Sequence, residues 1–112
     1  MKLNRLLLIL LLFSCFSLSS CDLHKYSLKV TGETFLMKEG PYRSNSLIKR
    51  PRTSFRKGDL IFFKTDNVYD ADVVVRLNGE KLDYYDYEDG LSFRFYMPGL
   101  DSEISISIEG GL

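Results

Sequence analysis

The sequence predicts one small all-β domain, an antiparallel β-sandwich or half-barrel, behind an N-terminal export signal. Apolar and polar residues alternate with a period of two over residues 26–30, 91–97 and 104–108, as they do in strands that bury one face. After the signal, no apolar stripe with helical spacing extends over ten residues. We therefore expect a β module over residues 26–109, followed by a flexible tail at 110–112.

Two denser apolar runs, residues 60–63 and 73–77, predict central strands covered on both sides. Between residues 73–77 and 80–85 stands Asn78-Gly79, which favours a two-residue type I′ hairpin because both central positions of that turn need positive φ. Lys57-Gly58-Asp59 and Pro98-Gly99 predict further turns.

The alternating positions also predict the core. We expect these residues to be buried together: Phe93, Phe95, Ile104 and Ile106, with Leu60, Phe62, Val73 and Val75 as neighbours. Residues 40–56 contain Pro41, Pro51 and few apolar side chains, which predicts a loop or irregular edge. This stretch would separate a short N-terminal hairpin from a longer C-terminal meander.

The first 21 residues have the order of an export signal. Lys2 and Arg5 precede an unbroken apolar run over residues 6–13, and small residues then lead to Cys21. A transmembrane helix needs about 20 apolar residues, and serines interrupt this run well before that length. Ordinary secretory cleavage is the other alternative.

Leu18-Ser19-Ser20-Cys21 resembles the lipobox of bacterial lipoproteins: an aliphatic residue, two small residues and a cysteine. The resemblance implies a diacylglyceryl group on Cys21 and removal of residues 1–20, which leaves residues 21–25 as a short lipidated tether. Two acyl chains anchor a protein stably, whereas one gives marginal binding. The expected location is the extracytoplasmic face of the cell membrane, with palmitate-type acylation.

Cysteine usage and charge constrain the mature domain further. Cys15 leaves with the signal and Cys21 is expected to be acylated, so neither a disulfide nor a thiol nucleophile is expected. Residues 21–58 carry 9 Lys or Arg and 3 Asp or Glu, a net of +6, whereas residues 59–112 carry 4 and 12, a net of −8. Opposite fields of this kind predict mutual attraction within the fold or a polarised surface.

Four segments in order resemble small bacterial extracellular modules of the internalin-type and immunoglobulin-like repeats. They are a Gly-Asp strand start at 55–61, an Asn-Gly hairpin at 74–81, a Phe-x-Phe-x-Met-Pro strand end at 93–98 and a last strand at 104–106. Those modules are spacers or binding units, and the resemblance implies no catalytic residue.

Two surface stretches are candidates for binding. The first is a basic loop without an acid, in which Lys49, Arg50 and Arg52 would face an anionic membrane or remain solvated. The second is residues 83–90, whose Tyr84, Tyr85, Asp86 and Tyr87 would contact a protein or glycan, collect calcium, or pack on their own sheet. We expect no bound metal and no cofactor.

The remaining chemistry-bearing residues give no catalytic constellation. His24 would lie on the tether. The segment at 46–49 matches the S-x-x-K pattern of penicillin-recognising enzymes but lacks its partner motifs, and Asp83 with Asp86 lacks a surrounding motif. We therefore expect a non-enzymatic binding or structural module with an envelope protein or glycan as partner and no nucleic acid. The alternative is an inhibitor or protective protein that occupies the cleft of an envelope hydrolase or toxin. The sequence sets no oligomeric state.

Overall fold

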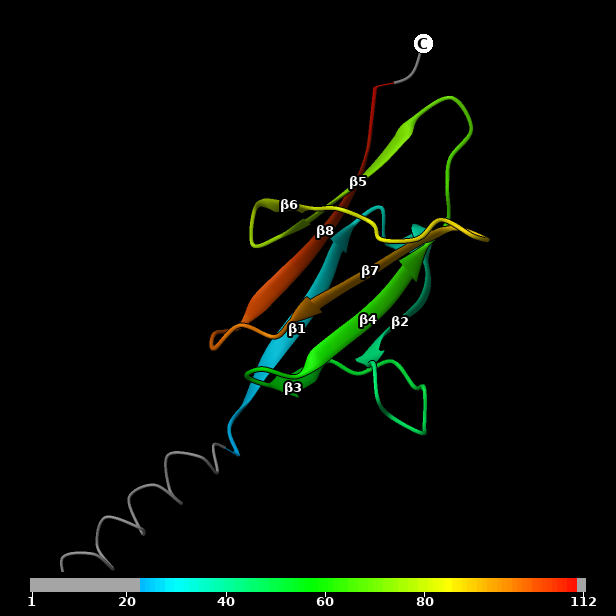
Figure 1. The fold of residues 1–112 in the computed structure, drawn as a ribbon. Coiled ribbons are helices and arrows are strands. Elements are labelled where there is room, and N and C mark those ends of the chain that lie inside the picture. The colour runs from blue at the N-terminus through cyan, green and yellow to red at the C-terminus, as the bar shows by residue number, and fades with distance from the viewer. Residues whose placement is uncertain (1–22, 111–112) are drawn as a thin grey trace, which may run out of the picture.

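Two β-sheets packed face to face make up the body of the protein (Figure 1). The computed structural model describes residues 23–110, so the predicted signal, residues 21 and 22 of the tether, including Cys21, and the last two residues lie outside the described part. The elements are β1 (Lys25–Gly32), the 3₁₀ helix η1 (Thr34–Leu36), β2 (Met37–Arg43), β3 (Ser54–Arg56), β4 (Leu60–Thr65), β5 (Asp72–Leu77), β6 (Glu80–Leu82), β7 (Leu91–Tyr96) and β8 (Ser102–Glu109). The all-β sandwich expected from the sequence is confirmed. Among the described residues, no helix has the length and apolar character needed to cross a membrane.

The strand pairing differs from the expected N-terminal hairpin and C-terminal meander. One sheet has the order β3-β1-β8-β5-β6 and the other has the order β2-β4-β7. β1 pairs with β8 in parallel, so the sandwich is antiparallel with one parallel pair. Gly32, with φ of 81°, lies against the carbonyl of Ile106, and the chain then crosses through η1 to the second sheet. β2 consequently pairs with β4 instead of returning along β1.

The core lies between the two sheets and contains the predicted Phe93, Phe95, Ile104, Ile106 and Val75. It also contains Leu28, Leu91 and Met97, which lie on the alternating faces predicted to be buried, and four residues that the sequence prediction missed, which are Leu36, Phe55, Ile61 and Phe63. The rings of Phe63 and Phe93 stack with their centroids 4.9 Å apart. Apolar burial of this kind stabilises the fold by about 1.5 to 3 kcal/mol for each large side chain.

The predicted phase of β4 was wrong by one residue. Ile61 and Phe63 point into the core, whereas Leu60 and Phe62 are only partly buried. Val73 is likewise partly buried and packs at the edge of the core. An apolar run that occupies both faces of a strand does not define which face is inside.

The predicted Asn78-Gly79 hairpin is confirmed between β5 and β6. Asn78 has φ of 52° and Gly79 has φ of 86°, and Leu77 pairs with Glu80. The Asn78 side chain also accepts a hydrogen bond from the backbone N–H of Glu103 at 2.9 Å and donates one to Ser102 Oγ at 3.1 Å. The turn therefore ties this hairpin to β8.

The stretch 40–56 contains a loop between two edge strands, β2 and β3, and the pairing of β2 with β4 is irregular. β2 continues through Pro41 to Arg43, and β3 supplies Phe55 to the core. Only residues 44–53 form a loop, which we call the basic loop. Its C-terminal end is fixed to both sheets: the N–H of Arg52 donates to the carbonyl of Pro41 at 2.9 Å, and the N–H of Leu28 donates to the carbonyl of Thr53 at 2.8 Å.

Candidate functional site

Residues 83–90, which we call the acidic tyrosine segment, connect β6 to β7 and lie along the edge of the three-stranded sheet (Figure 1). Two backbone hydrogen bonds hold the segment to the start of β7. The N–H of Tyr85 donates to the carbonyl of Ser92 at 3.0 Å, and the N–H of Ser92 donates to the carbonyl of Asp86 at 2.8 Å. The middle of the segment is thus an irregular extension of the sheet edge.

The predicted tyrosines divide into two groups. Tyr85 packs on the sheet: the guanidinium carbon of Arg94 lies 4.4 Å from its ring centroid, and the Phe62 ring lies 6.4 Å away, edge-on. Tyr84 and Tyr87 contact each other instead, with centroids 6.0 Å apart. All three rings are partly open to solvent, with Tyr84 50%, Tyr85 47% and Tyr87 68% exposed. The segment therefore presents aromatic surface to solvent while Tyr85 fixes it to the sheet.

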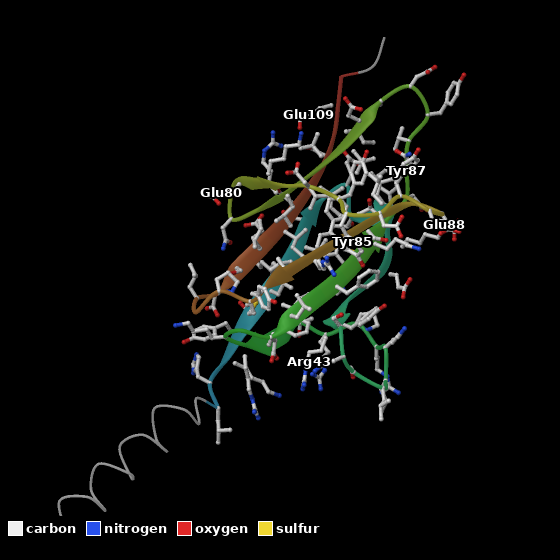
Figure 2. All side chains as sticks on the ribbon, viewed as in Figure 1. Arg43, Glu80, Tyr85, Tyr87, Glu88 and Glu109 are labelled. Carbon is white, nitrogen blue, oxygen red and sulfur yellow. The ribbon has the colours of Figure 1, made fainter. Side chains whose placement is uncertain are left out.

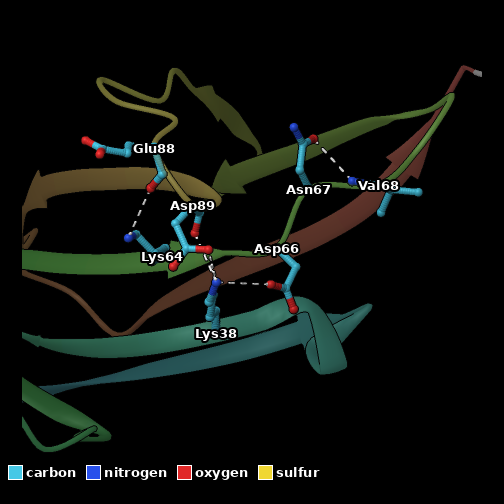
Figure 3. A network of polar contacts seen from close by, with 7 residues as sticks. All are labelled: Lys38, Lys64, Asp66, Asn67, Val68, Glu88 and Asp89. Carbon is cyan, nitrogen blue, oxygen red and sulfur yellow. Dashed lines mark hydrogen bonds and ion pairs between the residues drawn. The ribbon is translucent and has the colours of Figure 1, made fainter.

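A polar network holds the other end of the segment (Figure 3). Lys38 Nζ donates to the Asp89 carboxylate at 2.9 Å and to the Asp89 carbonyl at 3.1 Å, and it lies 3.8 Å from the Asp66 carboxylate. Lys64 Nζ donates to the carbonyl of Glu88 at 3.3 Å. The hydrogen bond and charge of Lys38 lower the pKa of Asp89, and Asp89 in turn raises the pKa of Lys38.

Close backbone approach explains the glycine at the end of the segment. Gly90 has φ of 116°, and a Cβ added there would lie 2.5 Å from the carbonyl oxygen of Thr65. Only glycine adopts this conformation at such a distance without strain. The segment can therefore return to β7 directly over the end of β4.

Beside the segment, the outer face of the three-stranded sheet carries an aromatic surface. We call it the outer aromatic face and define it by Tyr42, Phe62, Tyr85, Arg94 and Tyr96. The Tyr42 ring lies 5.3 Å from that of Phe62, and its hydroxyl donates to Glu39 Oε1 at 2.7 Å. Burial, reinforced by Glu39, raises the pKa of the Tyr42 hydroxyl, which stays protonated.

The sequence analysis did not predict Phe62 on this outer face because it placed Phe62 in the core. The cross-strand pair Phe62↔Arg94 shows that both residues share the outer face. The polar residue Arg94 between Phe93 and Phe95 was the available signal, since it marks the outward phase of β7. At the exposed end of the face, an open hollow of about 420 Å³ is lined by Leu60, Arg94, Phe95 and Tyr96.

The predicted membrane-facing residues Lys49, Arg50 and Arg52 are exposed on the basic loop. Within the described part of the chain, the cations that form ion pairs are Lys38 and Arg76. The close ion pairs of the described residues therefore do not involve the basic loop. An open groove of about 450 Å³ runs between this loop and β1, with apolar walls formed by Leu28, Val30, Pro41 and Pro51.

Other chemistry-bearing residues have structural roles. The His24 ring lies 4.5 Å from that of Tyr26. Ser46 Oγ, in the S-x-x-K match, donates to the carbonyl of Ile48 at 2.9 Å and so shapes the basic loop. Across residues 23–110, no group of three or more His, Cys, Asp or Glu side chains gathers in a way that could hold a metal ion.

Comparison of the chain with protein families, with curated proteins and with solved structures finds no match.

Proposed function

We propose that this protein is a membrane-anchored extracytoplasmic lipoprotein whose β-sandwich is a non-catalytic binding module. Its anchor is a diacylated Cys21, as the lipobox implies, and its partner is an envelope protein or glycan. The lone module would then resemble in use, as in sequence pattern, the binding units of bacterial extracellular β repeats.

The observation that carries the binding role is the exposed Tyr84–Tyr87 pair on a segment fixed at both ends. Tyrosine offers a large amphipathic surface with few side-chain torsions to order on binding. Immobilising a flexible side chain costs about 0.5 to 1.5 kcal/mol on association. The hydrogen bonds of Tyr85 and the ion pair of Lys38 with Asp89 reduce that cost by ordering the segment beforehand.

A glycan or protein ligand fits the neighbouring surface as well. On the outer aromatic face, the guanidinium of Arg94 lies over the ring of Tyr85, and Tyr96, which is 70% exposed, lines the same open hollow as Arg94. Flat rings next to a forked hydrogen-bond donor suit both the faces of sugar rings and protein hot spots. We propose that the acidic tyrosine segment and this face act as one surface.

Affinity capture from solubilised membranes tests the binding role. The full chain should retain envelope glycan or envelope proteins, and Tyr84→Ala combined with Tyr87→Ala should abolish retention. Tyr69→Ala is the matched control because Tyr69 is 92% exposed on a different loop. Capture of a single hydrolase or toxin, with inhibition of its activity, would instead support the inhibitor alternative. If the double variant retains as much glycan or protein as the wild type does, the segment is excluded as the binding surface.

The anchor is tested separately. Cys21→Ala should abolish acylation and move the full chain from the detergent phase to the aqueous phase on phase partitioning. Mass spectrometry of the wild-type protein should show the added lipid on Cys21. Partitioning that is the same in both proteins would contradict the anchor.

A further inference from the structure

The tip of the basic loop exposes two apolar side chains among cations. Leu47 is fully exposed and Ile48 is 67% exposed, and the cations Arg43, Lys49 and Arg50 lie within five residues of both in the sequence. Apolar residues bordered by Lys and Arg are typical of segments that bind at the bilayer interface. We propose that this loop inserts Leu47 and Ile48 into the surface of an anionic bilayer while its cations bind the lipid headgroups.

The position of the loop in the fold supports this partner. Lys25, at the start of β1, pairs with Arg56, and Arg43, at the end of β2, pairs with Ile61. The N–H of Ser44 donates to the carbonyl of Leu60 at 2.8 Å, which ties the loop to the same end of the sheets. Figure 1 shows the start of β1 and the loop after β2 at one end of the sandwich and the end of β8 at the other.

The chain outside the structure begins at that same end. Residues 1–22 precede the described part and contain the apolar run and Cys21. Whatever holds these residues at a membrane therefore brings the basic loop to it. The inference rests on the proposed envelope location for its biological setting, but the loop's affinity for lipid is a property of the folded body and can be tested alone.

Charge is distributed to suit an anionic surface. Within the described residues, none of the cations of the loop takes part in an ion pair. Two acids near this end accept backbone hydrogen bonds: Asp59 from the N–H of Arg56 and Asp101 from the N–H of Ser27. Figure 2 shows Glu88 and Glu109 toward the opposite end from Arg43. An anionic bilayer would thus meet cations at one end of the molecule and few carboxylates.

The loop is shaped before it meets lipid. The N–H of Ser46 donates to the carbonyl of Arg43 at 3.1 Å, and Ser46 Oγ donates to the carbonyl of Ile48. The N–H of Arg52 holds the other end to Pro41. These bonds leave the Leu47 side chain pointing into solvent, so insertion needs little reorganisation of the backbone.

Both the apolar and the cationic side chains of the basic loop should strengthen its binding to lipid by measurable amounts. Burial of an exposed Leu or Ile side chain strengthens partition by on the order of tenfold or more. Each cation close to an anionic bilayer contributes about fivefold. Neutralising Lys49, Arg50 and Arg52 together should therefore weaken binding to anionic vesicles by on the order of 100-fold.

The absence of tryptophan from the sequence allows a direct test in the full chain. Leu47→Trp gives a single indole at the loop tip, and Tyr69→Trp is the matched control on the exposed loop between β4 and β5. Each protein is mixed with vesicles of phosphatidylcholine, with or without phosphatidylglycerol, and with brominated acyl chains as quencher. We expect a shift of the indole emission to shorter wavelength and quenching for Leu47→Trp on anionic vesicles, and neither for Tyr69→Trp.

Three results would overturn the proposal. The first is unquenched, water-like emission of Leu47→Trp on anionic vesicles. The second is quenching that persists on neutral vesicles and after Lys49→Gln, Arg50→Gln and Arg52→Gln. The third is a short-wavelength emission in solution without lipid, which would mean that a second copy of the chain covers the loop. Repeating the comparison with Cys21→Ala separates the loop from the anchor. Loss of acylation changes how much protein is bound, but the difference between the two indole positions should remain.

Discussion

The phase of β4 can be tested by comparing Phe63 with Phe62, two neighbours on opposite faces of one strand. Phe63 has no exposed surface and stacks on Phe93 at 4.9 Å, with Phe95 edge-on at 6.2 Å. Truncation of such a side chain to Ala leaves a cavity and costs about 3 to 5 kcal/mol. A domain of this size has roughly 5 to 15 kcal/mol of stability in total.

Phe62→Ala should cost less, because Phe62 is partly exposed and its main contacts are the rings of Tyr42 and Tyr85. Each such aromatic pair contributes about 0.5 to 1.5 kcal/mol beyond buried area, so the expected cost is about 1 to 3 kcal/mol. One kcal/mol corresponds to roughly 4 to 8 °C in a small domain.

Thermal unfolding of residues 23–112, followed by circular dichroism, provides the assay for both variants. Phe63→Ala should lower the midpoint by at least about 12 °C or prevent folding. Phe62→Ala should keep a cooperative transition and change the tyrosine signal in the near ultraviolet. A midpoint for Phe62→Ala that is as low as that for Phe63→Ala would show that the strand is turned the other way.

Two further predictions concern the acidic tyrosine segment. Gly90→Ala should destabilise the domain by about 1 to 3 kcal/mol, as measured by chemical denaturation. Gly58→Ala should cost less, because an added Cβ at Gly58 meets open space whereas one at Gly90 meets the Thr65 carbonyl. Equal costs for the two variants would contradict the close approach at Gly90. The second prediction concerns pH. Lys38 lowers the pKa of Asp89 below its ordinary 3.8, so the stabilisation of the segment by the Lys38–Asp89 interaction is present above that pH. It is lost as the pH falls through the lowered pKa of Asp89. Hydrogen exchange of the Tyr85 and Ser92 amides, normalised for intrinsic exchange, should therefore accelerate in that acid range in the wild type. It should be fast and show no such step in Asp89→Asn.

Local chemistry made part of this fold predictable. Asn78-Gly79 determines its own turn, because few other residue pairs adopt positive φ at two successive positions. The polar residues that alternate with Phe93 and Ile104 along the sequence showed which faces of β7 and β8 point inward. In these strands a single alternation suffices to place each side chain.

Pairing between distant strands could not be predicted in the same way. The parallel register of β1 with β8 joins Leu28 to Ser102, and no local pattern specifies a neighbour so far along the chain. The same limit applies to the candidate site. The tyrosines were visible as a cluster, but the contact of Tyr85 with Phe62 and Arg94 depends on the β4–β7 register.

The separation of charge along the molecule is better explained by binding to a partner than by a contribution to the stability of the fold. An exposed ion pair contributes about 0 to 1 kcal/mol, so leaving the basic loop unpaired costs the fold little. A cation beside an anionic bilayer contributes about 1 kcal/mol, and several on one loop act together. The fold pairs Lys38 and Arg76 with carboxylates at the opposite end, while the loop that contains Lys49 and Arg50 forms no ion pair within the described residues. These magnitudes favour an external anionic surface as the counterpart of the loop.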